Sequence, residues 1–199
     1  MTTDKLAWQG RVLSVQPRIR LLRSFDERSH SYLGYVLQID GVIGDEERMF
    51  TVGIGKAAQA KHAFRSGNHV SGVCTPAGDP RKEPAEFYKA SKLMLLSPGS
   101  LPDQAPPPWQ GVPPSVDEYR QHGHRRLSAR TYTSKCNLCI WGCRMTVEIM
   151  VDHWNPSQRR YRTETFCYGP KNCPVYKSGP KRTVPGRRGM VWVEEDLVD

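Results

Sequence analysis

The chain has 199 residues, a formal net charge of +9 and a pI near 9.4. This length suits one large or two small domains, and the positive charge favours an anionic partner, of which nucleic acid is the commonest. The sequence has no apolar run long enough to cross a membrane and no apolar signal-peptide core near its beginning. We therefore expect a cytoplasmic protein without a membrane partner.

Residues 1–97 show the patterns of five strands and one helix. Apolar and polar side chains alternate in the first strand, where Leu13, Val15 and Ile19 share one face, and in the second, where Tyr35 and Leu37 share one face. The expected strands are residues 8–23, 32–40, 49–54, 69–75 and 87–96.

The alanine-rich residues 56–65 predict a helix between the third and fourth strands. Ala57, Ala60 and Phe64 would form an apolar stripe along one side of it. The sequence Ser66-Gly67-Asn68 then ends the helix, because Gly and Asn are the residues that commonly follow a helix.

The resulting order, strand-strand-strand-helix-strand-strand, resembles that of the OB-fold, a five-stranded barrel. Two local features add to the resemblance: the opening Trp8-Gln9-Gly10-Arg11-Val12, and the pattern of Gly67, Asn68, Val70 and Gly72 at the beginning of the fourth strand. The resemblance implies a barrel that binds nucleic acid through one face and the loops beside it.

In such a barrel, aromatic side chains stack on bases and basic side chains follow the phosphates. Each residue taken alone also fits an ordinary solvated strand face, and only their clustering favours a binding role. The candidate contacts on the outward face are Arg18, Arg20, Arg23, Phe25, Arg28, Tyr32, Lys89 and Lys92.

Residues 98–114 are rich in proline and predict an extended linker, which Trp109 could pin to a surface. Ser115 followed by Val116-Asp117-Glu118 predicts the beginning of a short helix, because acids favour the first turn. Gly123 would end it.

Five of the six cysteines lie between Cys136 and Cys173, with the spacing C-x2-C-x3-C-x23-C-x5-C. Two alternating segments, 144–154 and 159–166, flank the turn-forming residues 155–158 and predict a β-hairpin. The hairpin would bring the two cysteine clusters together and resembles a zinc ribbon, although x5 is wider than the usual x2. We expect a structural zinc site; its ligands would be Cys136, Cys139, Cys167 and Cys173.

Cys143 leaves one cysteine more than a zinc site needs. It would be a small buried apolar residue, or else a ligand, with Cys136, Cys139 and either Cys167 or Cys173, of a 4Fe-4S cluster. Disulfides are a third reading, disfavoured by the absence of a secretion signal. A histidine of His122-Gly123-His124 is an alternative ligand, although surface histidines are more often simply solvated.

Positive charge concentrates near the cysteines. Residues 120–190 contain 15 Lys or Arg and only three Asp or Glu, and residues 177–188 form a basic segment suited to neutralising phosphates. The candidate contacts here are Arg125, Arg126, Arg130, Lys181, Arg182, Arg187 and Arg188.

The sequence therefore predicts a mainly β protein: an OB-like barrel (1–97), a Pro-rich linker (98–114) and a small, basic, metal-binding hairpin module resembling a zinc ribbon (115–199). No nucleophile elbow, phosphate loop or zinc-protease helix is present, so we expect a binding protein rather than an enzyme. The expected ligand is single-stranded DNA or RNA. The alternatives are a protein-interaction module with a metal-stabilised docking hairpin and an iron–sulfur redox protein that uses Cys143.

Overall fold

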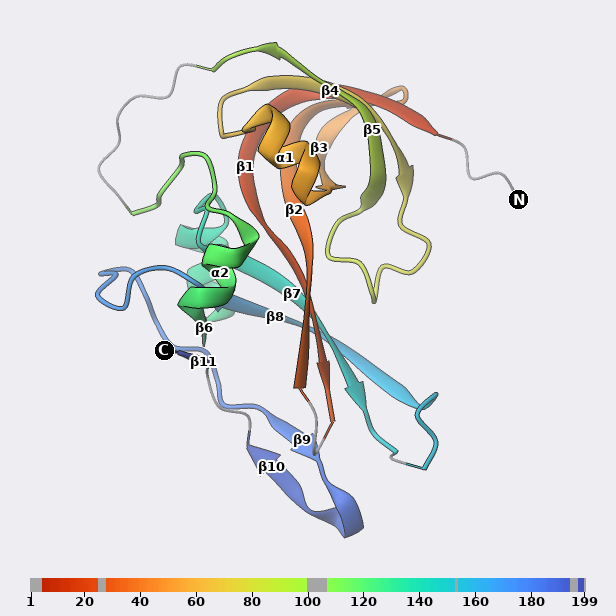
Figure 1. Cartoon of the computed structure of the whole chain (residues 1–199), viewed down its shortest axis with the longest axis vertical. Coiled ribbons are helices and arrows are strands. Elements are labelled where there is room, and N and C mark those ends of the chain that lie inside the picture. The colour runs from red at the N-terminus through yellow and green to blue at the C-terminus, as the bar shows by residue number, and fades with distance from the viewer. Residues whose placement is uncertain (1–4, 25–27, 100–106, 153, 194–196, 199) are drawn as a thin grey trace.

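The computed structural model describes residues 5–24, 28–99, 107–152, 154–193 and 197–198, and it is mainly β (Figure 1). The strands are β1 (Leu6–Arg23), β2 (Arg28–Ile43), β3 (Glu46–Ile54), β4 (His69–Pro76), β5 (Phe87–Ser97), β6 (Gly123–Arg126), β7 (Gly142–Met150), β8 (Arg159–Cys167), β9 (Thr183–Pro185), β10 (Val191–Val193) and β11 (Leu197–Val198). The helices are α1 (Lys56–His62), α2 (Val116–His122), α3 (Ala129–Thr131), a π-helical turn (Tyr132–Cys136) and a 3-10 turn (Arg187–Gly189). No helix among the described residues is long and apolar enough to cross a membrane.

The first five strands close into a ring. Strand β1 pairs with β2 on one side and with β4 on the other, and β5 joins β3 to β4. The order around the ring is β1-β2-β3-β5-β4 and back to β1, and α1 lies across it between β3 and β4 (Figure 1). The five predicted strands and their positions along the chain are confirmed.

Strand β1 changes its inward face part-way along. Its pairing with β2 shifts register between Val12 and Ser14, so Trp8 and Val12 point into the core before the bulge and Val15 and Ile19 after it. The prediction that Leu13 belongs to the inward face is therefore wrong, and Leu13 is only half-buried.

Helix α1 begins where the sequence predicts but presents a different side to the barrel. It ends at His62, because Ala63 adopts a left-handed conformation (φ 48°) and its N–H donates to the carbonyl of Gln59. The predicted stripe is wrong for Ala57 and Ala60, which are exposed. Gln59 is buried instead, and its side-chain nitrogen donates to Phe64 O at 2.8 Å, which satisfies the amide donor inside the core.

The second part of the chain contains the predicted helix and hairpin. The Ser115 side chain accepts a hydrogen bond from Glu118 N at 3.2 Å and caps α2, and Gly123 ends the helix with φ 65°. Strands β7 and β8 pair antiparallel from Gly142↔Cys167 to Met150↔Arg159. Their inward side chains include Met145, Val147 and Ile149.

Both parts of the chain share one sheet and one core. Strand β7 pairs parallel with the distal end of β1, from Arg20↔Thr146 to Arg23↔Ile149, which extends the sheet through β8 and β6 to β11. Buried residues of β1 and β2 and of β7 and β8 lie in the same hydrophobic cluster. The described end of the linker is fixed between them, because Ile140 N donates to Trp109 O at 2.9 Å and Tyr35 Oη donates to Pro114 O at 2.8 Å.

Candidate nucleic-acid groove and cysteine cluster

A groove of about 410 Å³ runs between the ring and the C-terminal hairpin. Its floor is the outer surface of β1, β2 and β3, contributed by residues such as Gln16, Gln38 and Thr51. The loop between β4 and β5 forms one wall, and Tyr132, Asn137, Arg144 and Thr163 form the other. The groove exists because β7 pairs with β1 and brings the second half of the chain beside the barrel.

Charged contacts hold the β4–β5 loop in place. Arg18 Nε donates to Glu83 Oε1 at 2.7 Å, with both side chains largely buried, and the Arg18 guanidinium lies against Gly53, which has no side chain to obstruct it. Further along, Arg48 Nη1 donates to Glu86 Oε2 at 2.8 Å. Arg18, predicted as a nucleic-acid contact, therefore positions a wall of the groove.

The same loop reaches across to the hairpin. The guanidinium of Arg81 and the ammonium of Lys82 lie 5.2 Å and 5.8 Å from the centre of the Tyr161 ring on β8. This cation–π arrangement places two cations and one aromatic ring at the rim of the groove.

Gln16 joins the floor of the groove to the first cysteine pair. Its amide nitrogen donates to Cys136 O at 3.0 Å and to Cys139 O at 2.8 Å, and its amide oxygen accepts from Tyr132 Oη at 2.6 Å. The side chain is largely buried, and these three bonds satisfy both polar atoms of its amide. The conformation of the C-x2-C segment is thus tied to strand β1.

The four cysteines predicted as zinc ligands line one small cavity of about 10 Å³. The hairpin register places Gly142 opposite Cys167, and this brings Cys136 and Cys139 to the same end as Cys167 and Cys173. Across the described parts of the chain, no three Cys, His, Asp or Glu side chains are arranged as a group that could hold a metal ion. The thiols share a cavity without forming a coordination sphere.

Two opposing effects act on the pKa of these thiols: burial disfavours the thiolate, and backbone hydrogen bonds favour it. Burial, and then the neighbouring thiols of the cluster, raise the pKa of Cys136 to about 12. Burial also raises the pKa of Cys139, while the backbone N–H groups of Trp141, Trp109 and Gly142 hydrogen-bond to it and lower that pKa. Burial likewise raises the pKa of Cys167, so thiolates at Cys136, Cys139 and Cys167 would need a compensating cation beside them, and a soft divalent ion such as Zn²⁺ is the type that thiolates bind.

Arg125 organises the loop that contains the second pair. Its guanidinium donates to Pro170 O at 2.8 Å and to Lys171 O at 3.1 Å, and it lies 4.0 Å from the centre of the Tyr176 ring. The N–H of Gly169 donates to the sulfur of Cys167 at 3.4 Å. Arg125, predicted as a phosphate contact, is engaged in holding this loop.

Cys143 lies apart from the cluster. It is fully buried in the main hydrophobic core, where its thiol donates to Pro17 O at 3.5 Å, and burial raises the pKa of that thiol. It does not line the cavity shared by the other four cysteines.

The remaining predicted contacts fall into three groups. Arg23 and Arg126 are buried, so the expected outward position of Arg23 is wrong; Arg126 lies 3.6 Å from the carboxylate of Glu164. Arg20 and Tyr32 are half-buried. The exposed residues are Arg28, Lys89, Lys92, Arg130, Lys181, Arg182 and Arg188, whereas Phe25 and the side chain of Arg187 lie outside the described residues.

Sequence reasoning missed a pair of histidines on β2 and β6. The rings of His30 and His124 are 4.8 Å apart, and His124 is almost completely buried rather than solvated. Burial, followed by the charge of nearby arginines, lowers the pKa of His30 to about 4. The pKa of His124 is lowered further, by burial and then by His30 and the arginines. No local pattern announces this pair, because the two residues come together only through the tertiary fold.

Comparison with known proteins finds no matching family model, no matching curated protein and no matching solved structure, so the geometry of the groove and the cysteine cluster is the basis for any functional conclusion.

Proposed function

We propose that this chain binds single-stranded nucleic acid in the groove between the ring and the hairpin, and that the ring is an OB-fold barrel. The observation that carries the proposal is the position of the groove, which is lined by β2, β3 and the β4–β5 loop. OB-folds bind oligonucleotides on this face, between the loops that join strands one to two and four to five. The strand order around the ring and the place of α1 agree with that fold.

The side chains in the groove suit unpaired bases. Gln38 and Asn137 offer amide donors and acceptors to base edges, and Arg144 offers a cation to a phosphate. The two carboxylates of the loop wall are neutralised by Arg18 and Arg48, so they oppose an anionic ligand less than their number suggests.

We also propose that Cys136, Cys139, Cys167 and Cys173 hold a structural zinc ion. A cavity of about 10 Å³ has the scale of a single ion, whereas a 4Fe-4S cluster needs more room, and Cys143 lies elsewhere. Four thiolates would close the coordination sphere, so the metal would stabilise the wall of the groove without taking part in chemistry.

The test is a titration of fluorescein-labelled T15 and U15 oligonucleotides, followed by fluorescence anisotropy at several salt concentrations. Each phosphate contact adds roughly 0.7 to the slope of log affinity against log salt for single strands, so wild type should show a steep slope. Arg144→Glu should weaken binding and flatten the slope by about one contact, whereas Arg160→Glu, exposed on the same hairpin but outside the groove, should change both less.

Absence of binding at low salt would overturn the proposal. A salt-independent interaction would instead favour the protein-interaction module that the sequence also allows. Equal effects of the two substitutions would remove the groove from the interface while leaving binding by some other surface of the protein.

A further inference from the structure

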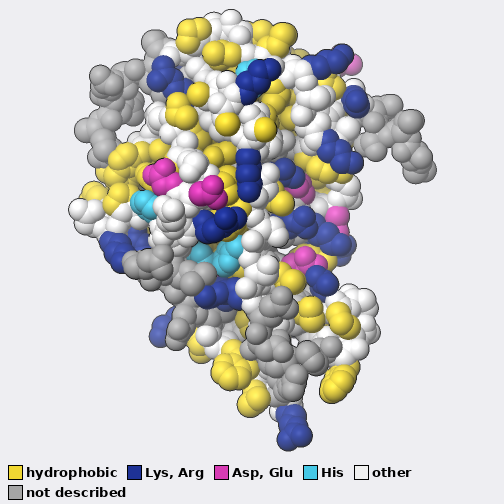
Figure 2. Space-filling view, in the orientation of Figure 1, with side chains coloured by type: hydrophobic (Ala, Val, Ile, Leu, Met, Phe, Trp, Pro, Cys, Tyr) yellow, Lys and Arg dark blue, Asp and Glu magenta, His cyan; other side chains and the backbone are white. Residues whose placement is uncertain are grey.

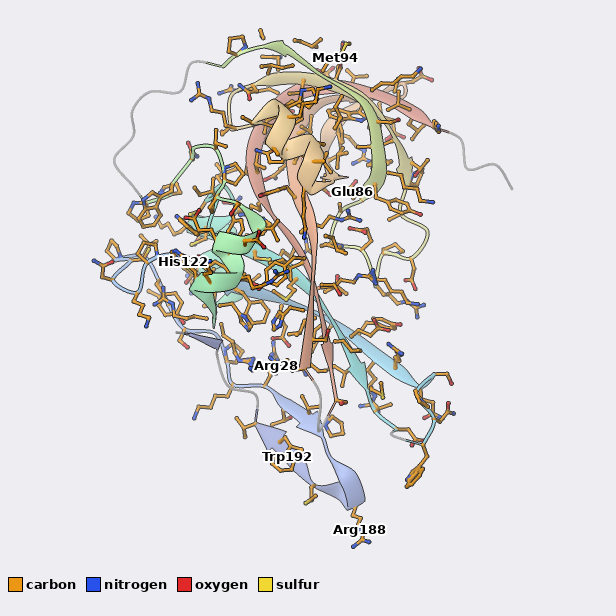
Figure 3. The ribbon with its side chains drawn as sticks, viewed as in Figure 1. Arg28, Glu86, Met94, His122, Arg188 and Trp192 are labelled. Carbon is orange, nitrogen blue, oxygen red and sulfur yellow. The ribbon has the colours of Figure 1, made fainter. Side chains whose placement is uncertain are left out.

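The β9–β10 hairpin presents a half-exposed tryptophan against a glycine. Trp192 pairs with Val184 across the hairpin and is 50% exposed. A Cβ atom added to Gly186 would lie 2.6 Å from the indole Nε1 and 2.9 Å from Cδ1. The pyrrole edge of the indole therefore rests against the backbone of Gly186, while half of the residue's surface remains exposed to solvent; Figure 3 labels this side chain on the hairpin.

The hairpin is anchored to the body of the protein. Val184 is 2% exposed and belongs to the main hydrophobic core, and Arg162 Nη1 on β8 donates to Thr183 O at 3.2 Å. The turn is closed by a hydrogen bond of 2.6 Å from Gly186 N to Met190 O. Trp192 is consequently held in a defined position, which lowers the entropic cost of using it as a binding surface.

The hairpin and the segment leading into it are basic. Residues 177–193 contain five Lys or Arg and no Asp or Glu, and Lys181, Arg182 and Arg188 are exposed. Arg188 lies at the tip, beyond Trp192, at the end of the molecule opposite the ring (Figure 3), and Figure 2 shows a basic side chain at that end. Acidic residues follow in the sequence at Glu194, Glu195 and Asp196, which lie outside the described residues.

A shallow depression lies next to the proposed nucleic-acid groove and reaches the residue that precedes this hairpin. It measures about 100 Å³ and is lined by Thr163, which also lines the groove, and by Pro180 and Arg182 at the base of the hairpin. Arg162, beside Thr163 on β8, is the residue that bonds to β9. A strand leaving the groove past Thr163 would therefore meet Arg182, which directly precedes β9 of the hairpin that carries Trp192.

We propose that Trp192 is a stacking platform for an unpaired base of the single-stranded nucleic acid that occupies the groove, with Lys181, Arg182 and Arg188 contacting the phosphates on either side. This inference rests on the proposed function. Stacking accepts any base, because every base has an aromatic face, whereas the cations favour an anionic chain. The supporting glycine keeps one edge of the indole fixed while the open surface receives the base.

The experiment compares variants of the full chain in the oligonucleotide titration. Trp192→Ala and Trp192→Leu should each weaken binding roughly tenfold, and Trp192→Phe should retain most of the affinity because the ring remains. The matched control is Trp154→Ala, which removes a 90% exposed tryptophan from the β7–β8 turn and should leave the affinity unchanged. Far-UV circular dichroism and melting temperature establish that every variant is folded.

A second arm tests whether a base is the partner. A T15 strand with one abasic site, moved along the sequence, should bind wild type several-fold more weakly at one position, and Trp192→Ala should erase that penalty. If Trp192→Leu binds as tightly as wild type, stacking is excluded while the proposed function stands. If wild type binds no oligonucleotide, both fail. Trp192-dependent sedimentation with phosphatidylglycerol vesicles, without oligonucleotide binding, would assign the hairpin to an anionic membrane surface instead.

Discussion

At the level of single residues, the five cysteines of the C-terminal half differ in what surrounds their sulfur atoms. Four line one cavity, and Cys143 occupies the core beside Pro17. We expect Cys143→Ala to retain about one zinc per chain and to cost about 1 to 2 kcal/mol of unfolding free energy through a small core cavity. Cys139→Ser should lose the metal and much more stability. Elemental analysis and thermal unfolding of the purified variants measure both quantities.

Iron and sulfide in the wild-type protein, with absorbance near roughly 400 nm that disappears in Cys143→Ala, would contradict this assignment and make Cys143 a cluster ligand. A metal-free wild type that melts at the same temperature with and without added zinc would contradict it differently, because the cavity would then hold four inert thiols.

The buried histidine pair makes stability depend on pH. His30 and His124 have folded-state pKa values below the ordinary 6.5, that of His30 about 4, because burial and nearby positive charge disfavour protonation. Below pH 6.5 the unfolded chain binds protons that the folded chain excludes, so stability falls as pH drops from about 6.5 towards 4. His124 alone contributes a slope of about 1.4 kcal/mol per pH unit.

Urea unfolding at a series of pH values from 7.5 to 4.5 tests this effect. Replacing His124 with Leu should flatten the slope by about one proton. A profile of His124→Leu that superimposes on wild type after a uniform offset would remove this histidine from the pH dependence.

Site residues whose partners are close in the sequence could be predicted, whereas those whose partners are far away in the sequence could not. The cavity shared by the cysteines could be predicted, because the C-x2-C spacing and the alternation in the hairpin strands are both signals between residues close in sequence. Gln16 looked like any outward polar residue of a strand, and its burial depends on Cys136 and Cys139, far along the chain. Arg126 can be buried because its guanidinium forms an ion pair with Glu164 on another strand.

At the level of strands and helices, Gly34 allows β2 to pass close to the end of β3. Its φ is +131°, and an added Cβ would lie 2.2 Å from Ile54 O, a backbone atom that cannot rotate away. We expect Gly34→Ala to reduce the unfolding free energy by about 3 kcal/mol, because strain and a backbone clash act together. Denaturant unfolding of the purified variant measures the loss.

Gly55 provides the matched control, since an added Cβ there meets no atom within 4 Å and its φ of −79° suits any residue. Gly55→Ala should cost less than about 1 kcal/mol. Equal losses in the two variants would mean that glycine at position 34 is not required by the close approach of the strands.

The sequence predicted closely where the strands begin and end, but it predicted less well which side chains point into the core. Alternation located β1 within two residues of its observed beginning, yet it could not reveal the bulge at Leu13, since a bulge depends on the pairing with β2. The helix face was missed for a related reason. Gln59 is buried because its side-chain nitrogen donates to the carbonyl of Phe64. A hydrophobicity pattern counts the cost of burying this polar side chain but not the hydrogen bond that offsets it.

At the level of the whole molecule, the barrel and the hairpin are joined through β1. A Pro-rich stretch between them predicted separable modules, but the parallel pairing of β1 with β7 has no local signature, because parallel neighbours are set by long connections. We expect one cooperative unfolding transition, with calorimetric and van't Hoff enthalpies in agreement. Two resolved transitions in differential scanning calorimetry would show that the shared core is energetically minor.

The shared strand also has a consequence for the order in which the protein can be completed. Arg20 and Thr146 are paired neighbours separated by more than half of the chain. At a synthesis rate of about 5 to 20 residues per second, the far end of β1 waits roughly 6 to 25 seconds for β7 to emerge. During that time the apolar side chains of Ile19 and Leu21, buried in the finished protein, lie beside an unpaired strand edge. We therefore expect the nascent chain to be open to chaperones and to aggregation until β7 pairs with β1.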